Sequence, residues 1–179
     1  TEIGGFAFSG CSSIKELTIP IGVTQILDST FKDCSSLSKI AIPSTIKTIG
    51  KSTFEGCKSL LKIELPKDIT SIDKYAFQGC SLITEIDIPS SIEIIEESLF
   101  KGCSKLSKIT IPNSIKTIQN FAFNECSSLK EISIPTSVTF IGESTFSGCS
   151  SLSQFELSKS LTFIGESAFS FCTTLKQIT

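Results

Sequence analysis

The chain has 179 residues, a formal net charge of −2 at pH 7 and no histidine, methionine or tryptophan. A slightly acidic chain is not expected to bind nucleic acid or an anionic membrane surface, because both favour a coherent basic stripe. Without histidine the usual general base at neutral pH is missing, so we expect no catalytic residue, no cofactor and no enzymatic activity. No apolar run is long enough for insertion into a membrane.

The cysteines recur every 23 residues from Cys11 to Cys172, so the whole chain is one repeat array. A fixed period of this length is typical of a solenoid, in which each repeat forms one rung and buries its apolar side against its neighbours. We therefore predict a single repeat domain over residues 1–179 with about eight rungs. A lone rung buries too little apolar surface to offset the ordering of its backbone, so stability must come from stacking.

Each repeat begins with a turn that carries a phenylalanine three residues before the cysteine. The segment Ser-Thr-Phe-x-Gly-Cys predicts a tight turn or a turn of 3-10 helix. A glycine directly before the cysteine favours a backbone with φ > 0. It occurs in five repeats, as Gly10, Gly56, Gly79, Gly102 and Gly148.

A short strand follows each cysteine. In residues 37–43, Ile40 and Ile42 alternate with Lys39 and Ala41, which predicts a strand with one buried face. Proline ends this strand in six repeats, because it has no N–H to donate to the ladder between rungs. A second brief strand is expected over residues 45–50 and their equivalents on another side of the rung.

The repeated string Cys-x-x-Leu-x-x-Ile-x-Ile-Pro resembles the BspA-like leucine-rich repeats. The Asn or Cys of the common leucine-rich-repeat core is replaced, for example by Thr45 or Asp68. That family has 23-residue repeats and occurs in surface and secreted proteins of mucosal bacteria and protists. The resemblance implies a β-rich, right-handed solenoid of short parallel strands, a location at the cell surface or outside the cell, and adhesion to host or microbial proteins.

The cysteines themselves allow two interpretations. Stacked rungs bring equivalent Cα atoms to about 5 Å, which is within reach of a disulfide. The simpler interpretation is a row of buried thiols, each with its S–H directed at a backbone carbonyl. A linear row cannot supply the four converging ligands of a zinc site, so we predict no metal site.

Two candidate binding surfaces emerge from the outward positions. The strand after each cysteine should form a concave face of mixed charge that binds a protein ligand, although a merely solvated face remains open. Its candidate residues are Lys39, Lys62, Glu64, Glu85, Asp87, Lys108 and Glu131. The second strand places Ile94, Phe140 and Phe163 at one position, where they either form an exposed apolar patch or tuck against the edge of the solenoid.

Neither end of the array has a capping repeat, so we expect a fragment of a longer repeat protein whose open ends can self-associate. Two classes of function stay open. One is an extracellular module that recognises a protein through its concave face. The other is an intracellular scaffold or a purely structural repeat segment.

Overall fold

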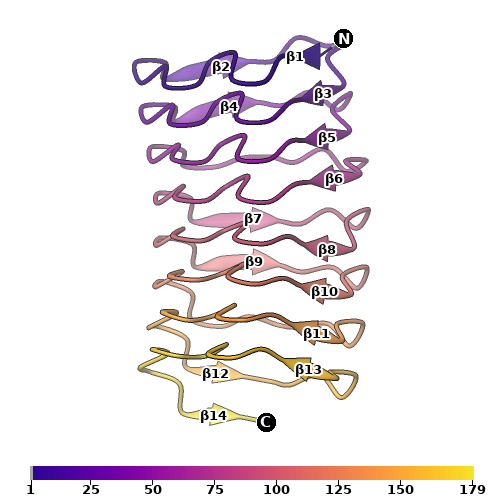
Figure 1. Cartoon of the computed structure of the whole chain (residues 1–179), viewed down its shortest axis with the longest axis vertical. Coiled ribbons are helices and arrows are strands. Elements are labelled where there is room, and N and C mark those ends of the chain that lie inside the picture. The colour runs from indigo at the N-terminus through magenta and orange to yellow at the C-terminus, as the bar shows by residue number, and fades with distance from the viewer. Residues whose placement is uncertain (1) are drawn as a thin grey trace.

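The chain winds as a parallel β-solenoid in this computed structural model, which describes residues 2–179. The rungs stack along the long axis of the molecule, and the two termini lie at opposite ends of the stack (Figure 1). None of the described residues is helical. The predicted solenoid is therefore confirmed.

Two ladders of short strands run along the stack. The first ladder consists of the strands that follow the cysteines: β2 (Glu16–Thr18), β4 (Lys39–Ala41), β7 (Glu85–Asp87), β9 (Lys108–Thr110), β12 (Gln154–Phe155) and β14 (Gln177–Ile178). The second ladder consists of β1 (Glu2–Ile3), β3 (Gln25–Ile26), β5 (Thr48–Ile49), β6 (Ser71–Ile72), β8 (Ile94–Ile95), β10 (Thr117–Ile118), β11 (Phe140–Ile141) and β13 (Phe163–Ile164). Every pairing is parallel and joins equivalent positions of consecutive rungs.

A column of phenylalanine rings fills the centre of the stack. Neighbouring rings from Phe8 to Phe169 lie parallel, with centroids 5.4 to 5.7 Å apart. The six rings from Phe31 to Phe146 are buried. One phenylalanine per rung therefore supplies a continuous apolar core, and each ring depends on the rung above and below it.

The segment before each cysteine is a series of tight turns rather than a 3-10 helix. The residues five and one before every cysteine have φ between 49° and 79°. This left-handed backbone interrupts a 3-10 helix and turns alternate N–H groups in different directions. The Cys34 N–H bonds within its rung to the Phe31 carbonyl at 3.1 Å, whereas the Phe31 N–H bonds to Thr53 of the next rung at 2.9 Å. The expected positive φ before the cysteine is confirmed, and Asp33, Glu125 and Phe171 adopt it without glycine.

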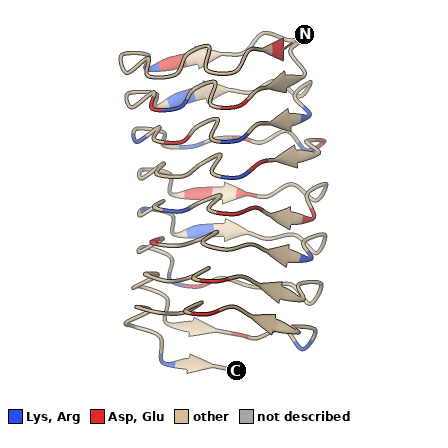
Figure 2. Cartoon of the chain, viewed as in Figure 1, with Lys and Arg blue, Asp and Glu red and all other residues tan. Residues whose placement is uncertain are grey.

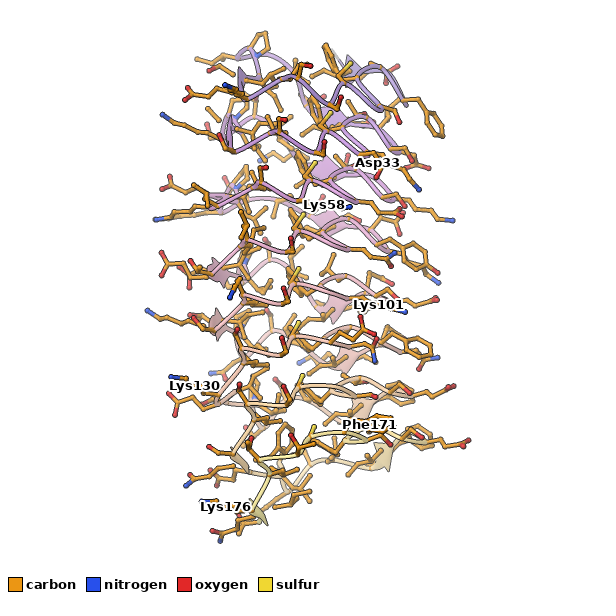
Figure 3. The ribbon with its side chains drawn as sticks, turned by 90° about the vertical axis from the view of Figure 1, so that its left-hand side faces the viewer. Asp33, Lys58, Lys101, Lys130, Phe171 and Lys176 are labelled. Carbon is orange, nitrogen blue, oxygen red and sulfur yellow. The ribbon has the colours of Figure 1, made fainter. Side chains whose placement is uncertain are left out.

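All eight cysteines are free, and the seven from Cys34 to Cys172 point at backbone carbonyls, as the simpler interpretation predicts. The Cys57 Sγ donates to the Phe31 carbonyl of the preceding rung at 3.2 Å, and Cys103 donates to Phe77 at the same distance. Figure 3 shows the sulfur atoms following one another along this side of the stack. Each of these seven thiols therefore ties its rung to the rung before it.

Both ladders are interrupted at one junction, between the rungs of Cys57 and Cys80. No backbone hydrogen bond joins residues 61–65 to residues 84–88, and β6 does not pair with β8. Backbone hydrogen bonds cross this junction only between the turns, for example from the Tyr75 N–H to the Glu97 carbonyl at 3.1 Å. The Phe77 and Phe100 rings follow the unpaired strands β6 and β8 in the chain. They are the most widely spaced neighbours of the column, at 5.7 Å.

Like charges occupy equivalent positions on the two sides of this junction. Glu64 precedes Asp87 by one repeat on the first ladder, and Asp73 precedes Glu96 by one repeat beside the second. Carboxylates directly opposite one another destabilise a strand pair. Burial, followed by the nearby charge of Asp73, raises the pKa of Glu96 above its ordinary value. A second interruption of the first ladder, between residues 107–111 and 130–134, has no such charge pair.

Glu96→Gln is expected to stabilise the fold by up to about 1 kcal/mol at pH 7, because it removes the repulsion from Asp73. A carboxyl whose pKa is raised in the folded state binds its proton more tightly there than in the unfolded chain. The stability of the parent chain should therefore gain from this group as the pH falls from 7 through the raised pKa, and Glu96→Gln should lack that gain. Urea unfolding at pH 7 and pH 5 measures both effects. Glu93→Gln, an exposed neighbour, is the control, and equal behaviour of the two variants would contradict the explanation.

Candidate functional site

The first ladder presents a charged, exposed face that contains all of the predicted strand-face residues. Among the strands of this ladder, Figure 2 shows charges on β2, β4, β7 and β9, whereas β12 and β14 carry none. The outward side chains are exposed while the isoleucines between them face the core, which is the alternation expected of a strand with one buried face. Lys39, Glu85, Asp87 and Lys108 lie on strands; Lys62, Glu64 and Glu131 lie on segments between strands.

Lys62 is the centre of the charge arrangement on this face. Its ammonium lies 3.7 Å from a Glu64 carboxylate oxygen and 3.6 Å from one of Glu85, so it bridges the junction between the two rungs. All three side chains are well exposed, and such pairs contribute little to stability. These three charged side chains are therefore not needed for stability and are accessible to a binding partner.

The structure brings Lys39, Lys62, Glu64, Glu85 and Asp87 together along two adjoining hollows, whereas Glu131 lies apart from them. Lys62, Glu64, Glu85 and Asp87 line one hollow of about 310 Å³ at the junction. Glu131 lines a separate hollow between later rungs, with residues such as Gln154 and Lys159. Figure 3 shows Lys130 and Lys176, which come from first-ladder segments, on the opposite side of the stack from Lys101.

The second candidate surface is only partly assembled as predicted. The Phe140 and Phe163 rings stack with centroids 4.8 Å apart, and Phe163 exposes 49% of its surface. Phe163 is exposed and Phe140 is half-buried, so the pair is only partly exposed, and Phe163 does not tuck against the edge. Ile94 is also exposed, but Thr117 stands between Ile94 and Phe140 in the strand register.

A network of side chains at the turn side holds the junction together where the ladders are open. The Tyr75 hydroxyl donates to a Glu97 carboxylate oxygen at 2.7 Å, and the Lys74 ammonium lies 3.1 Å from the other oxygen. The hydrogen bonds from Tyr75 and Lys74 lower the pKa of Glu97. The Lys51 ammonium lies 5.5 Å from the centre of the Tyr75 ring. The sequence pattern did not reveal this network, although the replacement of serine by Tyr75 at its position was a visible signal.

The profile of the BspA type leucine-rich repeat region matches the chain in six copies, over residues 1–104 and 72–179. The chain belongs to this family. A search of curated proteins finds no match. Among the described residues no helix is long and apolar enough to cross a membrane.

Solved structures of bacterial leucine-rich repeat proteins are similar to this solenoid. A leucine rich cell surface protein from Faecalibacterium prausnitzii A2-165 is 31% identical with a TM-score of 0.79, covering 86% of this chain and 42% of that one. A protein from Bacteroides ovatus is 31% identical with a TM-score of 0.69, covering 99% and 58%. The T. pallidum leucine-rich repeat protein is 27% identical with a TM-score of 0.80, covering 94% and 80%. The chain thus spans about half the length of the first two.

Proposed function

We propose that the chain is a non-enzymatic protein-recognition module of adhesin type, acting at the cell surface or outside the cell. The observation that carries this proposal is the first-ladder face, where exposed charges of both signs stand on a scaffold whose phenylalanine core is buried. The BspA-type family and the cell surface protein of Faecalibacterium prausnitzii support the location and the role. Mixed charges on a rigid surface supply specificity and a salt-dependent association rate.

Binding to epithelial cells or to purified extracellular-matrix proteins tests the proposal. The double variant Lys62→Glu/Asp87→Lys reverses the charges of the face and should weaken binding at least tenfold, with a smaller loss at high salt. Phe140→Ser/Phe163→Ser removes the apolar pair on the other ladder and should leave binding unchanged. Loss only in the phenylalanine variant would move the site to that pair, and binding of none of these partners by the parent chain at micromolar concentration would overturn the adhesin role.

A second candidate function, an intracellular scaffold, is favoured by the thiols. All eight cysteines are free, and free cysteines persist in reducing compartments. Fractionation of the native host into cytosol, cell surface and medium, with thiol counting by intact mass on the recovered protein, separates the two. Disulfides or a cleaved leader would support the extracellular role, and a chain confined to the cytosol would support the scaffold.

A further inference from the structure

Two apolar residues on the first-ladder face stand where other repeats carry polar ones. Leu61 is the fourth residue after its cysteine, and the equivalent residues are lysine, serine or threonine in every other repeat. Ala41 is the seventh residue after its cysteine, where the other repeats have threonine, serine, aspartate or glutamate. Both are exposed, Leu61 with 55% of its surface open to solvent.

The two exceptions lie in the same place. Leu61 and Ala41 come from consecutive rungs and line one hollow of about 540 Å³, together with the half-buried Ile42. The Leu61 N–H bonds to the Ser38 carbonyl at 3.3 Å, which fixes it beside β4. Hollows of roughly 300–1,000 Å³ with an apolar floor and a few polar groups are typical binding sites. A single exposed leucine has no particular meaning, but two coincident exceptions produce an apolar floor on a charged face.

The rim of this hollow carries two lysines that face one another. Lys39 and Lys62 are direct partners in a parallel bridge, and like charges directly opposite destabilise a strand pair. The Lys62 ammonium is already paired with the carboxylates of Glu64 and Glu85. Lys39 has none within ion-pair distance among residues 2–179, although Glu16 is its register partner on β2. The rim therefore offers one cation whose charge the protein itself does not pair.

We propose that this hollow binds an extended peptide segment in which an apolar side chain stands next to a carboxylate. The apolar side chain would lie on Leu61 and Ala41, and the carboxylate would reach the Lys39 ammonium. This inference rests on the proposed function, because it names the chemistry of the segment that the first-ladder face recognises. The size of the hollow fits one side chain and its neighbours, so the affinity of an isolated peptide is modest and a whole protein adds the remaining contacts.

Titration of the ¹⁵N-labelled chain with a blocked heptapeptide, acetyl-Gly-Ser-Leu-Asp-Leu-Ser-Gly-amide, tests the proposal. Amide shifts should centre on residues 38–42 and 61–62. Two matched peptides isolate the contributions, one with asparagine in place of aspartate and one with alanine in place of both leucines. Binding of either matched peptide as tightly as the first, or no binding of the first, would overturn the proposal.

Three exposed positions give matched variants. Leu61→Ser installs a residue that other repeats carry there, so the fold should tolerate it, and it should weaken peptide binding about tenfold. Lys39→Gln should weaken binding about two- to fivefold, as expected for an exposed charge pair. Glu16→Gln removes the competing carboxylate and should strengthen binding by a similar factor. Changes of the same sign in Lys39→Gln and Glu16→Gln would contradict the proposed role of charge.

The same Leu61→Ser variant separates this inference from the proposed function. If the charge-reversed double variant loses a protein partner while Leu61→Ser retains it fully, the face binds protein but the hollow does not contribute, and the inference fails alone. If both variants retain the partner, the first-ladder face is not the binding surface and the proposed function fails. Loss in both variants supports both.

Discussion

Native Cys103 is expected to react with a thiol reagent about a thousandfold more slowly at pH 8 than the same residue in the unfolded chain. Burial raises the pKa of Cys57 and of Cys103 from the ordinary 9.0 to about 12. Since only the thiolate attacks, a shift of this size lowers the reactive fraction by about three powers of ten. Stopped-flow reaction with a disulfide reagent, in native buffer and in about 6 M denaturant to unfold the chain, measures the ratio of the two reaction rates.

The same shift predicts a loss of stability at alkaline pH. Between pH 9 and pH 12 such a thiol ionises in the unfolded chain but stays protonated in the folded state. Ionisation therefore stabilises the unfolded chain in this range, and the free energy of unfolding falls as the pH rises above 9. Each such thiol should cost about 1 kcal/mol per pH unit in that range, and six cysteines of the described chain are buried. The urea midpoint should therefore fall more steeply between pH 9 and pH 10 than between pH 8 and pH 9. Cys103→Ala should make the decline shallower, and an unchanged slope would show that the thiols are not responsible.

The period of the sequence was sufficient to predict most of the fold. One phenylalanine and one cysteine at fixed positions in every rung leave parallel stacking as the arrangement that buries them all, and alternation around Ile40 identified the strand and its buried side. The direction of the thiols also followed, because a small buried donor in a stacked turn has only a neighbouring carbonyl to bond. Properties common to every repeat are therefore readable from one repeat.

Differences between rungs were harder to predict, because they depend on pairs of rungs rather than on a repeat. Glu64 and Asp87 are each ordinary on an exposed strand, and only their alignment one period apart places two carboxylates at the junction where the ladder is interrupted. Leu61 departs from a polar column, yet its meaning depends on Ala41 in the rung before it. Thr117 is visible in the sequence between Ile94 and Phe140, and the strand register confirms that it separates them. Comparing neighbouring repeats pairwise would have revealed the first two features.

Phe100→Ala is expected to lower the free energy of unfolding by about 3–5 kcal/mol. The Phe100 ring is fully buried between those of Phe77 and Phe123, with centroids at 5.7 and 5.5 Å. Removing it leaves a cavity and deprives both neighbours of their stacking partner. Because rungs are coupled only to their neighbours, the loss falls on the two interfaces of this ring, one of which lies at the junction where the strand ladders are already interrupted.

The variant should therefore unfold in two steps rather than one, with the rungs on either side of Phe100 separating in stability. Urea unfolding followed by circular dichroism measures the total loss, and hydrogen exchange assigns each step to residues. Lys105→Ala, at an exposed position of the same rung, is the control; Lys101 is unsuitable because its ammonium lies 5.5 Å from the Phe121 ring. A midpoint shift no larger than that of Lys105→Ala would mean that the ring column does not hold the stack, and a single cooperative step in Phe100→Ala would show that coupling extends beyond adjacent rungs.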